Sequence, residues 1–149
     1  MRKGSVMVEL AVSVVALTLL GAGGFQFGYL FWARQQLQSA IASGARYASR
    51  LDYLGRTDRC VQRSYDVARN LVVYGDPKPG PDASPLIPGL RPSHVAVEVH
   101  ADPQGVPQSI TMSVRDFQVD AVFSRYRMHG SPSATVPFQG RYAPHGCPQ

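Results

Sequence analysis

The sequence predicts an α+β protein, in which a long amino-terminal membrane-spanning helix continues into a small head with a second helix and an antiparallel sheet of about three to four strands. Three patterns predict this fold. An uncharged run of 23 residues extends from Leu10 to Trp32, an apolar stripe with helical spacing follows, and alternating apolar residues fill the last third of the chain. At about 1.5 Å per helical residue, the uncharged run alone would cross the roughly 30 Å hydrocarbon core of a bilayer.

The 149 residues divide into four predicted segments. Residues 1–4 form a leader, residues 5–51 the long helix, and residues 52–149 an extracytoplasmic head that contains a proline-rich loop at 76–93. The head, roughly 100 residues long, is large enough for one small domain. The formal net charge of +5 falls to +3 without the two basic residues of the leader, which is too small to predict nucleic-acid binding.

One acidic residue stands at the edge of the uncharged run. Glu9 precedes the run directly, and Arg2 and Lys3 lie ahead of it. A carboxylate in a membrane helix is costly, so it indicates a function and requires a partner. Cleavage after Gly4 would supply one, because it exposes a positively charged amine on Ser5. The basic leader, the small residue before the cut and the glutamate at the fifth position after it resemble the prepilin peptidase signal of type IV pilin-like proteins.

The residues that follow extend this resemblance. Together and in order, the acid, the span and its helical extension resemble the amino-terminal module of the TadE/TadF-like family, the pseudopilins or minor pilins of the tight-adherence (Tad) type IVb pilus system. The segments that carry the resemblance are Glu9–Ala11, Phe25–Gly28, Ala33–Ala40 and Gly44–Ala48. Leu10 departs from the family, which commonly has an aromatic residue after the acid, and this leaves the subfamily open.

The resemblance implies partners and a location. The partners are prepilin peptidase, other pilins or pseudopilins, Tad inner-membrane assembly proteins and the membrane lipid around the span. The location is a bacterial inner membrane, with a cytoplasmic amino terminus, a periplasmic head and incorporation into an extracellular pilus as a further step. Charge alone decides the orientation poorly. Arg2 and Lys3 favour a cytoplasmic amino terminus, but Arg34, Arg46 and Arg50 offset that bias from the other end of the span.

Two other interpretations of the apolar segment stay open. A cleaved secretory signal peptide would use Gly21-Ala22-Gly23 as its cleavage site, although Leu10–Leu20 contains no polar transition and Glu9 would then have no role. A plain single-pass anchor needs no cleavage at all. Lipoprotein processing is excluded at this end, because no cysteine precedes Cys60.

Three glycines, Gly21, Gly24 and Gly28, share one face of the predicted span. Each glycine costs about 1 kcal/mol relative to alanine in an ordinary helix, whereas in membranes such a face allows close helix packing. Packing against a neighbouring pilin-type helix and ordinary glycine enrichment explain the face equally well. The aromatic residues at the far end of the span predict an interfacial belt, and they are Phe25, Phe27, Tyr29, Phe31 and Trp32.

The long helix is predicted to continue beyond the membrane, because apolar residues recur there at intervals of three and four. They are Leu37, Ala40, Ile41, Gly44, Ala45, Ala48 and Leu51. A second helix is predicted from Thr57 or Asp58 to about Val73, ending at Gly75. Its predicted buried residues are Val61, Tyr65, Ala68, Leu71 and Val72. Its arginines alternate with acidic residues, which favours a solvated face over a surface for an anionic partner; they are Arg56, Arg59, Arg63 and Arg69.

The rest of the head is predicted as a loop followed by strands. Six prolines between Asp76 and Ser93 exclude a regular ladder or helix, so this segment is predicted to be an extended, exposed loop. A proline-motif ligand at Pro85–Pro88 is less favoured. Alternating apolar and polar residues then predict three strands. The residues predicted to face inward are Val95, Val97 and Val99 in the first strand, Ile110, Met112 and Val114 in the second, and Phe117, Val119, Ala121 and Phe123 in the third. The inward-facing positions switch at Arg115–Asp116, which predicts a bulge or turn there. A last strand is predicted from Thr135 to Tyr142, with Val136 and Phe138 facing inward.

The chain has two cysteines, Cys60 and Cys147. A disulfide between them would close a loop of nearly 90 residues, worth about 4–5 kcal/mol in the chain-entropy model. The even count suits an oxidising periplasm. Two unrelated buried thiols are the alternative, and the spacing of a redox or metal-binding Cys-x-x-Cys motif is absent.

The sequence predicts no enzyme, no cofactor and no metal site. His94 and His100 share a predicted strand face, but the histidines lack a metal-ligand spacing, and neither a nucleophile elbow nor a phosphate-binding glycine loop is present. The favoured function is a pseudopilin or minor pilin that contributes to assembly or priming of a Tad pilus after prepilin cleavage, with adhesion, secretion and DNA uptake as downstream processes. The alternative is a signal-anchored envelope module unrelated to pili, whose head binds a ligand through the proline-rich loop.

Overall fold

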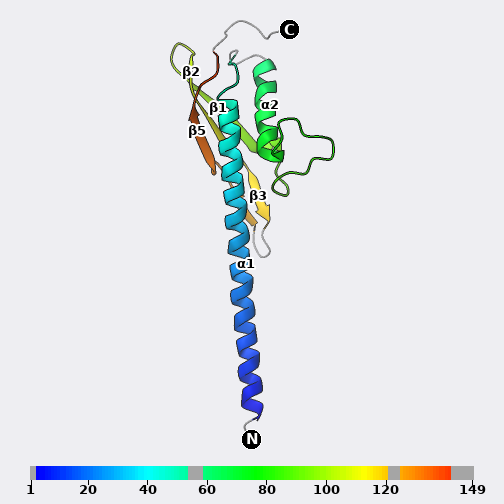
Figure 1. Cartoon of the computed structure of the whole chain (residues 1–149). Helices are drawn as coiled ribbons and strands as arrows, with labels where there is room; N and C mark the ends of the chain where they lie inside the picture. Colours follow the sequence, from blue (N-terminus) through cyan, green and yellow to red (C-terminus); the bar gives the residue numbers. More distant parts are fainter. Residues whose placement is uncertain (1–2, 54–58, 121–124, 142–149) are drawn as a thin grey trace.

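The computed structural model describes residues 3–53, 59–120 and 125–141, with side chains from residue 6 onwards except in 59–64. The molecule consists of a stem and a head (Figure 1). Helix α1 (Lys3–Ala48) forms the stem and continues through the head, where it packs against helix α2 (Arg59–Tyr74) and the strands.

The described strands form two antiparallel sheets. Strands β1 (Val95–Ala101), β2 (Pro107–Val114) and β5 (Ser133–Pro137) form a three-stranded sheet in the order β1-β2-β5. Strands β3 (Phe117–Asp120) and β4 (Arg125–Met128) form a separate hairpin, and a short 3-10 helix, η1 (Pro92–His94), precedes β1. The predicted α+β class, with a long amino-terminal helix, a second helix and antiparallel strands, is confirmed.

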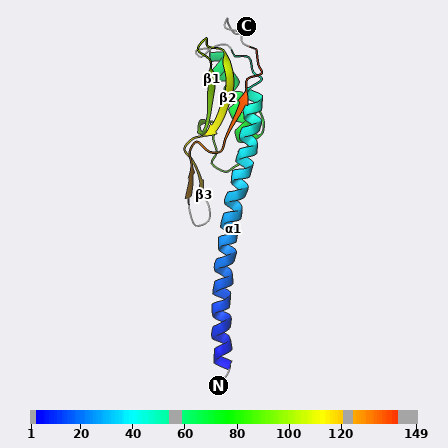
Figure 2. The ribbon, with the colours of Figure 1, turned by 90° about the vertical axis from the view of Figure 1, so that its left-hand side faces the viewer.

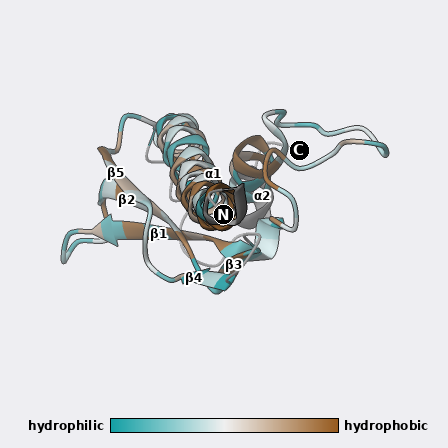
Figure 3. Cartoon of the chain, turned by 90° about the horizontal axis from the view of Figure 1, so that it is seen from below, coloured by the Kyte–Doolittle hydropathy of each residue, from teal (hydrophilic) through white to brown (hydrophobic). Residues whose placement is uncertain are grey.

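The two helices lie side by side on one face of the three-stranded sheet, as the view along the stem shows (Figure 3). The hairpin β3–β4 leaves this layer and extends along α1 towards the amino-terminal end of the stem (Figure 2). Strand β4 was not predicted from the sequence. Two of its four residues are arginines, three are exposed and only Met128 is buried, so the strand carries no clear apolar alternation.

The upper half of α1 buries the stripe that the sequence predicts. Leu37, Ile41, Ala45 and Ala48 are completely buried, and so is Ala33 one turn earlier. The helix ends at Ala48, because the next backbone N–H groups turn to closer carbonyls: Arg50 donates to Tyr47 at 3.2 Å and Leu51 to Ala48 at 3.2 Å. The predicted periodicity therefore sets which side of α1 faces the head, while the end of the helix falls slightly before Leu51.

The predicted inward residues of the sheet also meet across the strands. Val97 pairs with Met112 and Val99 with Ile110, and on the other side Ile110 pairs with Val136. Ile110, Met112 and Val114 are completely buried against the helices. The switch of inward-facing positions at Arg115–Asp116 is confirmed as a turn, since Asp116 has a φ of 50°. Ala121 and Phe123, predicted on the third strand, lie outside the described residues.

Helix α2 and the proline-rich segment cover the remaining side of the core. Tyr65, Ala68 and Val72 are buried as predicted, whereas Leu71 is only half-buried and Val73 is completely buried instead. Gly75, with a φ of 74°, follows the helix end. The described loop has no strand or helix before η1, and most of its residues are exposed as predicted, but the exposure is not continuous. Two of its apolar side chains are inserted into the core, where Ile87 is 1% and Leu90 is 2% exposed.

Burial on α2 perturbs one titratable group. Burial raises the pKa of the Tyr65 phenol from 10.0 to about 12, and the nearby Tyr53 adds to the rise. Because the folded state holds this proton more tightly than the unfolded state, the contribution of Tyr65 to stability is complete below pH 10 and is lost as the pH rises towards 12.

An ultraviolet titration of the folded chain checks this prediction. One of the seven tyrosines is expected to ionise near pH 12, and Tyr65→Phe is expected to remove that step. The variant is also expected to lose less stability between pH 10 and 12 than the unmodified chain. A step lost near pH 10, with the step near pH 12 retained, would contradict the assignment.

Candidate anchoring and assembly surface of the stem

The lower half of α1 exposes apolar side chains along its whole length. The large apolar residues between Val6 and Leu20 are 53–73% exposed, and none of the most apolar stretch of the helix is covered by the rest of the chain. In the described part of the chain, α1 is the one helix that is long and apolar enough to cross a membrane. A surface of this size and composition requires an apolar surrounding, either lipid or other helices.

The hydroxyl groups of this segment are satisfied within the helix. Ser13 Oγ donates to the Glu9 carbonyl at 2.8 Å, and Thr18 Oγ1 donates to the Val14 carbonyl at 2.8 Å. Such bonds to the carbonyl four residues earlier leave no unpaired hydroxyl donor in lipid. The hydroxyl groups of Ser13 and Thr18 are therefore compatible with burial in a membrane.

Glu9 lies exposed on the amino-terminal part of α1, four residues after Ser5. Within the part of the chain that the structure describes, no basic side chain forms an ion pair with its carboxylate. Because the Glu9 carboxylate takes no part in the core of the head, it is available to a group outside the chain. Gly4 and Ser5 lie in the first turn of α1, and their role as a processing site stays a prediction.

Two groups of glycines in α1 differ in what surrounds them. At Gly44, a Cβ atom would overlap with Cγ2 of Val72 and lie 3.3 Å from Sδ of Met112, so the absence of a side chain allows α1 and α2 to approach. At Gly21, Gly24 and Gly28, a Cβ atom would meet nothing within 4 Å. The head uses Gly44 for packing, whereas the glycine face of the stem has no neighbour within 4 Å among the residues that the structure describes.

The aromatic residues mark the upper end of the span. Phe27 is 75% and Phe31 65% exposed, and the rings of Tyr29 and Trp32 lie 5.9 Å apart between centroids. The first completely buried residue of α1, Ala33, follows directly. The completely buried part of α1 therefore begins where the aromatic residues end, in the order that an interfacial belt requires.

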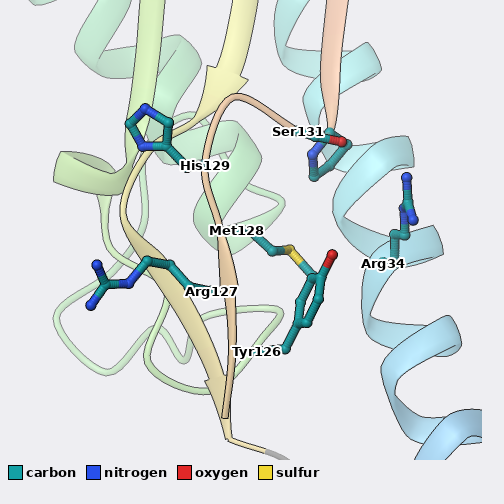
Figure 4. Close-up of a pocket in the computed structure, with 7 residues that line it drawn as sticks. Arg34, Tyr126, Arg127, Met128, His129 and Ser131 are labelled. Atoms are coloured by element: carbon teal, nitrogen blue, oxygen red, sulfur yellow. The ribbon is translucent and has the colours of Figure 1, made fainter.

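The structure brings together a groove that the sequence did not predict. It lies between the upper end of the span and the hairpin β3–β4, and its volume is about 220 Å³. Its lining residues are Phe27, Leu30, Phe31, Arg34, Tyr126 and Met128. The side chains of Tyr126 and Met128 extend from the hairpin towards α1 (Figure 4). No sequence signal indicated the groove, because one of its walls is the unpredicted strand β4.

The remaining polar residues singled out in the sequence have separate structural partners. His94 accepts from the Arg91 backbone N–H at 3.2 Å, whereas His100 Nε2 lies 3.0 Å from Thr111 Oγ1, so the two imidazoles do not share a site. Arg69 pairs with Asp66 at 2.6 Å and donates from Nε to the Val95 carbonyl. No cluster of three or more potential metal ligands occurs among the described residues. Cys147 and the side chain of Cys60 lie outside what the structure describes, so the disulfide between them stays a prediction.

The stem and head together fit a single-pass, membrane-anchored protein of the pilin-like class. Residues 4–46, which make up most of α1, match the model of the TadE family, described as TadE-like protein. This match confirms the resemblance that the sequence predicts, and the chain is consistent with a TadE-like protein of the Tad system. The match covers less than a third of the chain, and the head lies beyond it. No curated protein and no solved structure matched the chain.

Proposed function

We propose that this chain is a pseudopilin or minor pilin that contributes to assembly or priming of a Tad-type pilus. Prepilin peptidase would remove residues 1–4 at the cytoplasmic face of the inner membrane, and α1 would then pack with the helices of other pilins while the head stays outside the cytoplasm. The TadE-like match over residues 4–46 supports the association with this system. Proteins of this family are generally structural rather than catalytic.

The observation that carries the proposal is the combination of an uncovered apolar helix with one acidic residue near its start. Cleavage after Gly4 would place the positive amine of Ser5 at the end of the same helix, and the carboxylate of Glu9 would attract the amine of an adjacent subunit. A desolvated charge pair of this kind fixes the register between two helices better than it adds net stability. The open glycine face would allow the helices to approach closely.

The structure weakens the alternative in which the proline-rich loop captures a ligand. The centre of the candidate motif Pro85–Pro88 is Ile87, which is 1% exposed because it is inserted into the core. The neighbouring Leu86 N–H is bonded to the Val73 carbonyl at 2.7 Å. A partner of extended conformation would therefore find one face of this segment occupied by the head itself.

Deletion of the gene in its native cells tests the proposed function. Loss of surface pili, counted by electron microscopy, and their return on expression of the intact chain would support a role in assembly. A carboxyl-terminally tagged chain is expected to co-purify with other pilin-type subunits from detergent-solubilised membranes. Normal pili in the deletion strain, together with a purified chain free of such subunits, would argue for an envelope protein unrelated to pili.

A further inference from the structure

The groove between α1 and the hairpin β3–β4 lies at the boundary of the predicted span. Phe27 and Phe31 belong to the uncharged run and to the predicted interfacial belt at its upper end, whereas Arg34 lies two residues beyond Trp32, on the side of the belt nearer the head. From the hairpin, Tyr126 faces the stem beside Met128 (Figure 4). The groove is thus apolar at its lower end and cationic at its upper end.

Arg34 is the one charged residue among those that line the groove. On the hairpin, Arg127 points away from α1 (Figure 4), and Arg125 pairs with Asp120 at 3.2 Å between Nε and Oδ1. Arg34 has no acidic partner among the residues that the structure describes. A positive excess at the membrane surface attracts anionic headgroups.

The size of the groove restricts its occupant. An α-helix is about 10–12 Å in diameter with its side chains, so a neighbouring helix could lie over the groove of about 220 Å³ with only single side chains entering it. An extended acyl chain is much thinner and matches the apolar lining. A phosphate attached to such a chain would lie close to Arg34, a residue type that pairs well with phosphate oxygens.

We propose that this groove binds one anionic phospholipid of the membrane leaflet next to the head, with an acyl chain against Phe27 and Phe31 and the phosphate at Arg34. The bound lipid would hold the hairpin β3–β4 at the membrane surface and so fix the orientation of the head relative to the bilayer. The inference rests on the proposed membrane anchorage of α1 and not on pilus assembly.

Fluorescence quenching of the full chain in phosphatidylcholine vesicles tests the proposal. Because Trp32 is the one tryptophan of the chain, a Trp32→Phe, Tyr126→Trp double variant reports from the groove alone. The vesicles contain the same fraction of brominated lipid, as either phosphatidylglycerol or phosphatidylcholine. The groove is expected to prefer brominated phosphatidylglycerol about fivefold, the factor that corresponds to about 1 kcal/mol per basic residue at the surface.

Two arginine variants of the double variant provide the matched comparison. Arg34→Gln is expected to abolish the preference, whereas Arg46→Gln, which removes an exposed arginine higher on the same helix, is expected to retain it. Equal quenching by the two brominated lipids would overturn the proposal. If neither brominated lipid quenches the tryptophan introduced at position 126, and quenching appears when the protein is diluted in the vesicles, a second copy of the chain occupies the groove instead of a lipid. In the unmodified chain, an absence of Trp32 quenching by either lipid would reject the membrane anchorage itself.

Discussion

Replacement of Glu9 by glutamine is expected to leave cleavage after Gly4 unchanged and to abolish incorporation of the chain into pili. Glu9 is exposed on the stem and contributes nothing to the core of the head, so the variant should fold normally. In an assembled bundle, the substitution would leave the amine of an adjacent Ser5 buried without its counter-charge. Breaking a buried ion pair in this way costs roughly 3–5 kcal/mol, equivalent to a hundredfold or greater loss of association. The amount of chain in sheared surface fractions measures the effect.

Two substitutions serve as controls for this experiment. Glu9→Asp keeps the negative charge and is expected to retain part of the assembly. Glu98→Gln removes a glutamate of the head that pairs with Arg115 at an exposed site, and it is expected to assemble normally because surface ion pairs contribute little. Assembly of the Glu9→Gln chain at the level of the unmodified protein would remove the carboxylate from the mechanism.

Replacement of Gly44 by valine is expected to destabilise the head by about 3 kcal/mol, near the upper end of the usual cost of overpacking. The new side chain would have to occupy space that Val72, Met112 and the Ala68 carbonyl already fill. Separation of α1 from α2 would relieve the overlap but would expose the buried stripe of α1. For a head of roughly 100 residues, the midpoint of thermal unfolding should fall by more than about 10 °C. Near-ultraviolet circular dichroism of the full chain in detergent micelles measures this midpoint.

The glycine face of the stem offers a matched control. Gly24→Val introduces the same side chain into the same helix at a position with nothing within 4 Å, so the head is expected to unfold at its normal temperature. If the face packs against a neighbouring helix, this variant should be deficient in assembly although its head is intact. Equal unfolding midpoints for the Gly44 and Gly24 variants would show that α1 and α2 do not pack as closely as the structure describes.

Much of this fold could be predicted because the spacing of apolar residues along the chain shows which side of a helix or strand is buried. Leu37, Ile41 and Ala45 recur with helical periodicity, and Ile110 and Met112 alternate as in a strand with one buried face. These patterns record which side of each element is buried. A loop rich in proline has no such spacing, so nothing in the sequence marks Ile87 and Leu90 as core residues although both reach the core.

The candidate sites also divide into one that the sequence alone reveals and one that only the structure reveals. Glu9 could be found from the sequence, since one charge beside a long uncharged run is conspicuous without any knowledge of the fold. The groove at Arg34 could not be found, because Tyr126 lies far from the stem in sequence and on a strand without apolar alternation. A site that two distant segments form across a tertiary contact leaves no periodic signal in either one.

The mass of the intact chain purified from its native cells tests the central claim most directly. If α1 is a processed pilin-type helix, the mature protein begins at Ser5 and lacks four residues, which makes its new amine available to a glutamate of the next subunit. A chain that starts near residue 24 would instead reveal an ordinary secretory signal. A mass that retains Met1 to Gly4 would contradict the proposal, because Glu9 would then have no cleavage-derived cation to meet.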